Sequence, residues 1–224
     1  MNIFILNFCK FNKKTKLNLK LFFVGLFLVI GIQFIPTTIV RADVIVQGTM
    51  LTDKEYYELV DMVPEGYAIV SNERYESLIR QRATTGLFHQ AHVQNYGWLP
   101  TYNISKNFVG TVGKGLRLEA LKLIFQNMST NISYRAHVQS IGWQSWVSNG
   151  GIAGTTGRNL RIEALQITTS GKFGVFYSGH VESIGWGKWV SSGATTIGSG
   201  QFIGTTGQSK RLEAVDFILY EQQF

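Results

Sequence analysis

Cysteine is nearly absent from this sequence. Cys9 is the single cysteine among 224 residues, and it lies in an N-terminal stretch that we expect to be removed. The mature chain then has no thiol, which excludes disulfide bonds, thiolate catalysis and cysteine-bound metal. One histidine in every 44 residues or so, with no local cluster of carboxylates, is also a poor metal signature, so we expect no metal and no cofactor.

Net charge is lacking in the body of the chain. The formal net charge is +7, but six of the 21 basic residues lie within residues 1–42. The remaining 15 basic residues stand against 14 acidic ones. Charge therefore gives no argument for a nucleic acid or an anionic membrane surface as the partner.

Long apolar runs are missing too. The run Leu21–Ile32 has 12 residues, whereas a membrane-spanning helix needs about 20. A lysine-rich stretch precedes it, and Val40 and Ala42 suit the small-residue positions before a cleavage point. This pattern predicts a signal peptide over residues 1–42, with an uncleaved anchor as the alternative. We expect a protein secreted by a Gram-positive bacterium, either released or attached non-covalently to the cell surface.

The sequence does contain one motif written three times. Each copy has His-Val, Gly-Trp, Gly-Thr-x-Gly and Arg-x-Glu-Ala in the same order, and its histidine is one of His92, His137 and His180. The histidines are 45 and 43 residues apart. We place the copies at about residues 88–130, 131–172 and 173–220, with an insertion around ATTIGSGQ in the third.

The first copy departs from the other two at two positions. It has Thr101 where they have a second tryptophan, Trp146 or Trp189, and His89 where they have a tyrosine. Terminal repeats are often atypical, but a copy without its second tryptophan can also have lost a binding site.

The motif H-V-x-x-x-G-W-x-x-W, followed by G-T-x-G and R-x-E-A, resembles the ChW repeat (clostridial hydrophobic, conserved tryptophan). The resemblance covers about residues 88–220 in three copies. It implies an exported protein of Gram-positive bacteria with a role in extracellular binding or adhesion. It implies no enzymatic activity.

Alternation of side chains predicts strands in each copy. Tyr134, Ala136 and Val138 form one face and Arg135, His137 and Gln139 the other, which is typical of a half-buried strand. Along LRIEALQITT, strict alternation puts Arg161, Glu163, Leu165 and Ile167 on one face. We predict an all-β repeat domain with pseudo-threefold symmetry. Of two architectures we favour a β-prism over a β-trefoil.

Residues 43–82 differ in kind and predict a short two-helix segment. Thr52 and Glu55 form a capping box for the first helix, and Asn72 is the expected cap of the second. Two short helices bury little apolar surface alone, so we expect them to pack on the β domain or to mediate homo-oligomer formation.

The charged residues of the motif have a structural explanation. Arg117, Arg161 and Arg211 each precede a glutamate by two residues, so each pair shares one face of a strand. Since an isolated buried charge is costly, we expect a repeated ion pair with the histidine as a third member. Catalysis by these glutamates is disfavoured, because no second carboxylate lies at matching places.

All five tryptophans lie within the motif, and they are the candidates for ligand binding. We expect those that follow glycine to pack in the core and Trp146 and Trp189 to be exposed platforms for a sugar ring or a partner side chain. The ligand-binding candidates are Trp146, Trp189, Trp98, Trp143, Trp186, His92, His137 and His180.

The predicted function is a secreted, non-enzymatic module that binds carbohydrate or a cell-surface component. Equivalent sites on three copies also permit multivalent binding. The alternative is an adhesion module that binds a host or surface protein. A cell-wall hydrolase is the third reading, disfavoured because no unique catalytic set is present.

Overall fold

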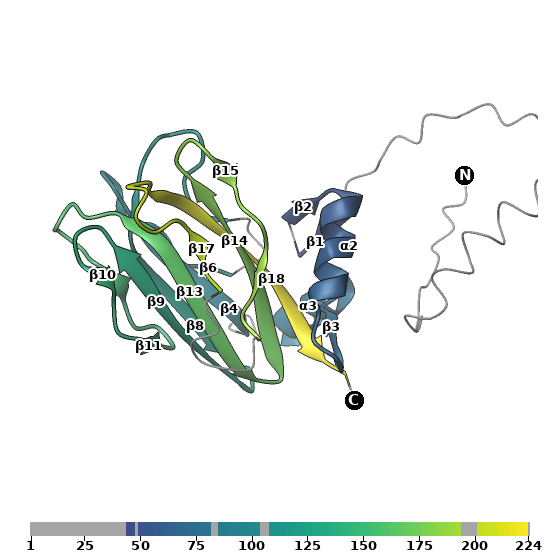
Figure 1. The fold of residues 1–224 in the computed structure, drawn as a ribbon. Helices are drawn as coiled ribbons and strands as arrows, with labels where there is room; N and C mark the ends of the chain where they lie inside the picture. Colours follow the sequence, from purple (N-terminus) through teal and green to yellow (C-terminus); the bar gives the residue numbers. More distant parts are fainter. Residues whose placement is uncertain (1–43, 48, 82–84, 104–107, 194–200, 224) are drawn as a thin grey trace, which may run out of the picture. The chain divides into compact units, whose positions relative to one another are not determined.

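Each copy of the motif builds one antiparallel sheet (Figure 1). The computed structural model describes residues 44–47, 49–81, 85–103, 108–193 and 201–223. The chain divides into two units, residues 1–40 and 41–224, and all described residues lie in the second. The predicted signal peptide and most of the insertion around ATTIGSGQ lie outside them. No helix among the described residues is both long and apolar enough to cross a membrane.

A pair of long antiparallel strands forms the centre of each sheet. We call this pair the hairpin, although short strands lie between its two members in sequence. The hairpin strands are β4 (Gly86–Val93) with β8 (Leu118–Gln126), β9 (Thr130–Val138) with β13 (Ile162–Gly171), and β14 (Phe173–Val181) with β18 (Leu212–Gln222). Each Gly-Trp pair is a short strand on the hairpin's first strand: β5 (Gly97–Trp98), β10 (Gly142–Trp143) and β15 (Gly185–Trp186). A second short strand of each repeat also pairs with the hairpin's first strand: β6 (Tyr102–Asn103), β11 (Val147–Ser148) and β16 (Val190–Ser191).

The repeats exchange one short strand with each other. These strands carry the first glycine of each Gly-Thr-x-Gly: β7 (Val109–Gly110), β12 (Ala153–Gly154) and β17 (Ile203–Gly204). β12 of the second repeat pairs with β8 of the first, and β17 of the third with β13 of the second. β7 of the first repeat pairs with β18 of the third, so the exchange closes a ring.

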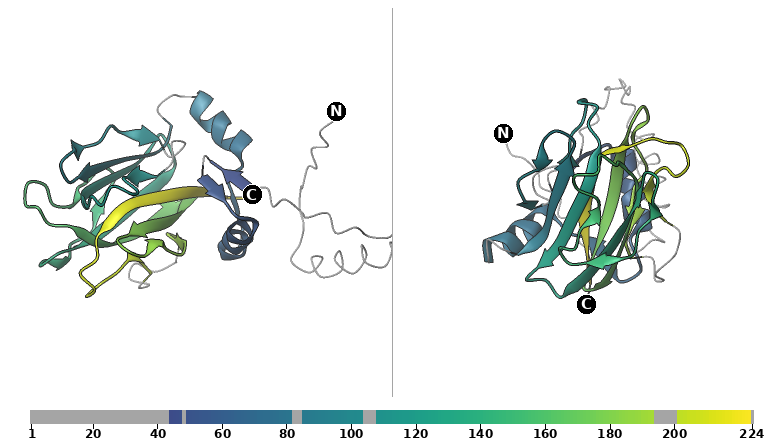
Figure 2. Two further views of the ribbon diagram at one scale, coloured as in Figure 1. Left: turned by 90° about the horizontal axis from the view of Figure 1, so that it is seen from above. Right: turned by 90° about the vertical axis from the view of Figure 1, so that its left-hand side faces the viewer.

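This ring confirms the predicted pseudo-threefold, all-β repeat fold. In the described residues the repeats form three separate sheets that face one core, which is the β-prism arrangement (Figures 1 and 2). A β-trefoil needs strands from all three repeats in one closed barrel. The expectation we favoured is therefore the observed one.

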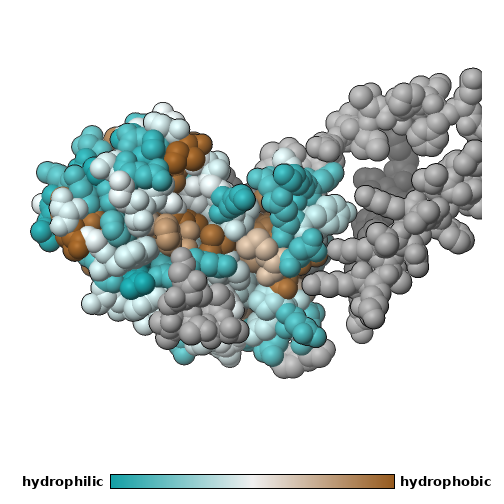
Figure 3. Space-filling model, in the orientation of Figure 1, coloured by the Kyte–Doolittle hydropathy of each residue, from teal (hydrophilic) through white to brown (hydrophobic). Residues whose placement is uncertain are grey.

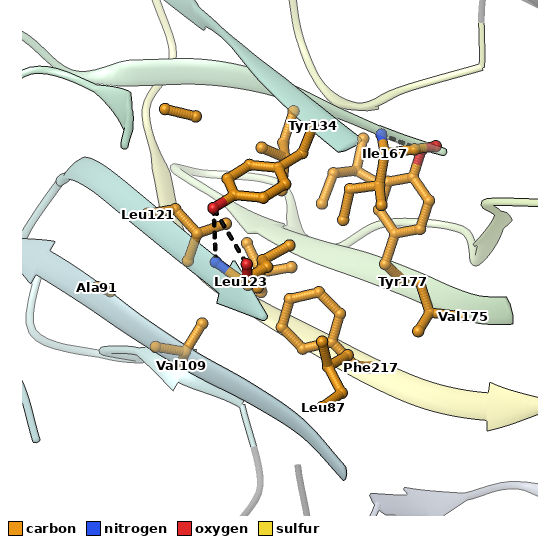
Figure 4. Packing of buried hydrophobic residues seen from close by; sticks show 14 of the residues in the cluster. Leu87, Ala91, Val109, Leu121, Leu123, Tyr134, Ile167, Val175, Tyr177 and Phe217 are labelled. Carbon is orange, nitrogen blue, oxygen red and sulfur yellow. Dashed lines mark hydrogen bonds between the residues drawn. The ribbon is translucent and has the colours of Figure 1, made fainter. Parts of the chain in front are cut away.

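The core is filled by the inward residues of all three hairpins (Figure 4). The hydroxyl of Tyr134 accepts the N–H of Leu123 at 2.9 Å and faces two carbonyl acceptors, Gly151 at 2.5 Å and Leu123 at 3.2 Å. Tyr177 bonds the backbone of Ile167 in the same way, at 3.1 and 3.5 Å. Each buried phenol is thus satisfied by the neighbouring hairpin, and it ties consecutive repeats together.

His89 occupies the third of these equivalent positions. It is 1% exposed and stacks on Phe217, with ring centroids 5.7 Å apart. In the part of the chain that the structure describes, neither ring nitrogen has a hydrogen-bond partner. Burial lowers the pKa of His89 to about 4, because the core disfavours the charged imidazolium. The departure noted in the first copy is therefore a neutral core histidine.

The N-terminal segment is joined to the third sheet. It consists of β1 (Val44–Val46), β2 (Thr49–Leu51), α2 (Asp53–Met62), β3 (Tyr67–Ile69) and α3 (Asn72–Gln81). β1 pairs with β2, and β3 pairs with the end of β18, which reaches out of the repeats toward the helices (Figure 1). The sequence pattern of this segment predicted helices only. The three-residue strands escaped it because so short a segment shows no readable alternation.

The helix caps agree with the prediction for α2 and differ for α3. The capping box is present, with Thr52 Oγ1 accepting the N–H of Glu55 and Glu55 accepting that of Thr52 at 2.9 Å. At the second helix Ser71 Oγ accepts the N–H of Arg74 at 3.1 Å, so Ser71 is the cap. The prediction of Asn72 is wrong by one residue, because its side-chain oxygen accepts an N–H from the β1–β2 turn instead.

The segment packs on the outward face of the third sheet. Leu51 and Leu59 form a second apolar cluster with Phe176, Ile218 and Tyr220, separate from the main core. Polar contacts support this docking, since the Thr49 hydroxyl lies 3.1 Å from a carboxylate oxygen of Asp216 on β18. Of the two roles expected for the segment, packing on the β domain is the one observed.

Candidate functional site

A β-bulge in each hairpin positions the repeated glutamate. The register of β9 and β13 shifts between Ile162 and Ala164, so Glu163 is the extra residue of the bulge. The same shift occurs at Glu119 and at Glu213 in the other two hairpins. A bulge re-aims a side chain that plain alternation would send to the opposite face.

The bulge corrects one sequence-based prediction. Alternation alone put Glu163 on the face of Leu165 and Ile167, and this is wrong. Leu165 and Ile167 point into the core, whereas Glu163 points outward, beside His137. A sequence does not reveal a bulge unless a turn residue marks it, and Ile-Glu-Ala has none.

Each bulged glutamate is the centre of a three-membered cluster. Glu163 Oε2 lies 3.1 Å from Nδ1 of His137, and Oε1 accepts from Nε and Nη2 of Arg161 at 3.0 and 2.7 Å. The other two repeats reproduce these distances within 0.2 Å. The three glutamate side chains are only 5 to 7% exposed, so their charge needs these partners. The expected arginine–glutamate ion pair is confirmed, and the histidine is the third member of the cluster, with Nδ1 beside the second carboxylate oxygen.

The glycine-linked tryptophans stand over the histidines. Trp98, Trp143 and Trp186, on the short strands β5, β10 and β15, each face the histidine opposite on the neighbouring long strand, with ring centroids 5.4 Å apart and interplanar angles of 79 to 85°. Each of these indoles is therefore held at the rim of its sheet by an edge-to-face contact.

In the second and third clusters an aromatic side chain of the following repeat in the ring packs on the indole. Phe202 of the third repeat packs on Trp143 of the second, at 5.6 Å between ring centroids. Phe108 of the first repeat packs on Trp186 of the third, also at 5.6 Å. In the first cluster Lys122 lies over the Trp98 ring, with Nζ 4.3 Å from the centroid. The three sites therefore share the histidine–glutamate–arginine cluster but differ in the side chain that packs on the indole.

The Gly-Thr-x-Gly segment lets the neighbouring repeats approach closely. Gly154 has φ +105°, and a Cβ there would lie 2.3 Å from the carbonyl oxygen of Glu119. Thr155 N–H donates to that same carbonyl at 2.7 Å. The glycine thus serves the approach of two backbones at the bulge, in addition to the turn expected from the sequence.

The exposure of the tryptophans differs from the expectation. Trp186, which follows glycine, is 43% exposed, and Trp98 and Trp143 are half-buried at the surface, outside the core cluster. Trp189 is half-buried because it packs against the cluster under the N-terminal segment. The prediction of core packing for the first tryptophan and an open platform for the second therefore fails, most clearly in the third repeat. The exposure of each tryptophan depends on which other segments of the chain pack beside it, and the local sequence does not contain this information.

Trp146 has a different surrounding from Trp189. The Arg135 guanidinium lies between two indoles of the second repeat, 4.9 Å from the Trp143 centroid and 4.8 Å from that of Trp146. Arg135 also donates to the side-chain oxygen of Gln166 at 2.9 and 2.8 Å. The second repeat therefore presents two tryptophans and an arginine on one surface.

These sites can bind by stacking and polar contact at the protein surface. Apolar residues gather in small, separate patches on the face of the molecule shown in Figure 3. Within the described residues no group of three or more His, Cys, Asp or Glu side chains could hold a metal ion. Each rim glutamate is already engaged by its arginine and lies beside its histidine.

Fold and sites together define a cyclic, three-repeat all-β protein in which each repeat completes its neighbour's sheet. The family model described as Clostridial hydrophobic W, ChW, matches residues 92–127, 137–171 and 180–219. The chain belongs to this family, as its motif indicated. Neither the curated proteins nor the solved structures that we compared include a match to this chain.

Proposed function

We propose that the protein is a secreted, non-enzymatic binding module that recognises carbohydrate or another cell-surface component through its tryptophan sites. Three ChW repeats are consistent with a repeat binding module. The observation that supports the finer proposal is the recurrence, three times in one geometry, of an indole held at the sheet rim over a histidine. A rigid, partly exposed indole stacks on the apolar face of a sugar ring.

The ring arrangement supports multivalent recognition. Because the sites recur round a pseudo-threefold axis, one molecule can engage repeating units of a surface polymer at several points, which multiplies weak affinities. The pairing of each rim glutamate supports a non-enzymatic role, since a carboxylate held by arginine is not free to transfer protons. Secretion is proposed from the predicted signal peptide alone.

A glycan array and a pull-down on purified bacterial cell walls test the proposal. We expect the full-chain protein to bind, and the double variant Trp143→Ala with Trp186→Ala to lose at least tenfold in apparent affinity. The matched control is Tyr57→Ala, which removes a 59% exposed aromatic on α2, outside the repeats. Unchanged binding by the double variant contradicts the assignment of the sites.

The second candidate is an adhesion module that grips a host or surface protein. The surface of Trp143, Trp146 and Arg135 favours it, because tryptophan and arginine are the residues enriched at protein-binding hot spots. Treating the target cells with protease separates the two candidates. A glycan ligand survives the treatment, whereas binding to a protein ligand is lost.

A further inference from the structure

A cavity of about 540 Å³ lies away from the tryptophan sites. The outer end of the second sheet, the loop before β3 and the edge of the third sheet enclose it. No residue of the histidine–glutamate–arginine clusters lines it, and neither does any of the five tryptophans. Its size is that of an ordinary small-ligand pocket, which is about 300 to 1,000 Å³.

Neutral polar groups and aromatic rings both line the cavity. Cross-strand neighbours of β9 and β13 form a row of four polar side chains: Asn131, Ser133, Thr168 and Ser170. The aromatic residues are Tyr67, Phe173 and Tyr220. None of the described residues that line the cavity is cationic, and Glu65 is the one ionised group among them. This lining disfavours an anionic ligand and suits a neutral molecule with many hydroxyl groups and an apolar face.

Part of the polar row is free to bond a ligand. The Ser133 hydroxyl lies 2.9 Å from that of Ser148, so one of its bonds is already made. Among the hydrogen bonds of the described residues, none involves the side chains of Asn131, Thr168 or Ser170. These three groups together offer two hydroxyls and one amide, which can donate and accept.

The repeat itself does not require hydroxyls at these places. Ser133 and Thr168 face each other across the hairpin of the second repeat. The equivalent pair is Phe88 with Ile124 in the first repeat and Phe176 with Ile218 in the third. The fold therefore accepts a large apolar pair here, and in the second repeat it carries small polar side chains where the cavity opens.

We propose that this cavity binds a neutral saccharide unit. The sugar hydroxyls bond to Thr168, Asn131 and Ser170, and the apolar face of the ring packs against Tyr67. The N-terminal segment supplies Pro64, Glu65 and Tyr67, so the site exists only in the docked arrangement of segment and repeats. None of the described residues that line it belongs to the proposed tryptophan sites.

Titration of the full-chain protein with defined oligosaccharides tests this proposal. The probes are chitotriose, maltotriose and mannotriose, with trigalacturonate as the anionic counterpart, followed by calorimetry and saturation-transfer NMR. At least one neutral trisaccharide is expected to bind saturably, and trigalacturonate at least tenfold more weakly. If no neutral probe binds, or if trigalacturonate binds as well as the best of them, the proposal is overturned.

One double variant carries the side chains that the third repeat already has at this position. Ser133→Phe with Thr168→Ile fills the cavity and should weaken binding of the neutral probe at least tenfold. Tyr57→Ala, which removes an exposed aromatic that does not line the cavity, is the matched control and should leave it within twofold. Should the filled variant lose the native circular dichroism spectrum, Ser133→Ala with Thr168→Val removes the same hydroxyls at nearly constant volume and should weaken binding instead.

A comparison of the cavity variants with Trp186→Ala separates the two proposals. Loss on filling the cavity with retention in Trp186→Ala supports the cavity site, whatever the tryptophans bind. The reverse pattern overturns the cavity site and supports a tryptophan site. Equal binding in the wild type and in both cavity variants likewise overturns it.

Discussion

The second and third sheets are built from the same repeat, but their outward faces differ. At equivalent places the second sheet carries Ser133 with Thr168, and the third carries Phe176 with Ile218. The apolar pair is buried under the N-terminal segment, whereas the polar pair lines a cavity. The motif thus constrains the inward face and the rim of each sheet and leaves the outward face free to take on separate roles.

The largest effect is expected from breaking the covered face. Ile218→Ala opens a cavity at a fully buried site and should lower the free energy of unfolding by about 4 kcal/mol. Thr168→Ala at the equivalent, half-buried position of the second sheet should cost less than about 1 kcal/mol. Urea unfolding of both variants measures the difference. Similar losses for the two would show that the outward faces are equally packed.

The rim, in contrast, should behave alike in all three repeats. Glu163→Ala leaves Arg161 and His137 without their carboxylate and should cost about 3 kcal/mol, as for other broken buried ion pairs. Glu119→Ala and Glu213→Ala should give values within about 1 kcal/mol of it, the latter the smallest because Arg211 keeps its second partner Glu182. Thermal unfolding of the three variants provides the comparison. A loss confined to one repeat would contradict the equivalence of the clusters.

Two buried groups that break the threefold symmetry predict opposite responses to acid. Burial lowers the pKa of His89 to about 4, so stability is complete above pH 6.5 and is lost as the pH falls from there toward 4. Burial raises the pKa of Asp216 to about 6, so stability increases as the pH falls through 6 toward 4. Each contribution is about 3 kcal/mol, at 1.36 kcal/mol per pKa unit.

Replacing either His89 or Asp216 should leave the pH dependence of stability that the other group causes. His89→Tyr restores the residue of the other two repeats, and its stability should rise between pH 7 and 4. Asp216→Asn should give the opposite trend. Denaturant unfolding at pH 7, 5.5 and 4 checks both, with the wild type between them. Parallel pH profiles for the two variants would refute this assignment.

The smallest effect concerns the N-terminal segment alone. Thr52→Ala removes the cap of α2 and should cost about 1 kcal/mol. The exposed pair Lys54–Glu58 on the same helix offers a control, since Lys54→Ala should change stability by less than about 0.5 kcal/mol. Hydrogen exchange of the α2 amides measures both. A Thr52 variant with unaltered protection would mean that docking on the third sheet, and not the cap, sets the stability of α2.

Much of the fold could be predicted from the sequence, because the same pattern of residues occurs in all three repeats. The alternation around His137 places the hairpin strands, and the Arg-x-Glu spacing anticipates the ion pair. The side of the strand on which Glu163 lies was not readable. Pairing with a second strand creates the bulge, and one residue of slippage reverses the face.

The tryptophan sites show the same division. The sequence identified the residues, but it assigned the exposed role to Trp189 where the structure gives it to Trp186. Trp189 is covered because the N-terminal segment, more than 100 residues earlier in the chain, docks beside it. No local pattern carries that information.

The sequence by itself determined the three repeats, the class of fold, the faces of the first long strand of the repeat and the set of rim residues. These follow from the period-two pattern and from the cost of an unpaired charge, which act within a few residues. Only the tertiary structure decided the cyclic exchange of strands, the face of the bulged glutamates, the exposure of each indole and the cavity beside Thr168. Each of these depends on which distant segment lies against which sheet.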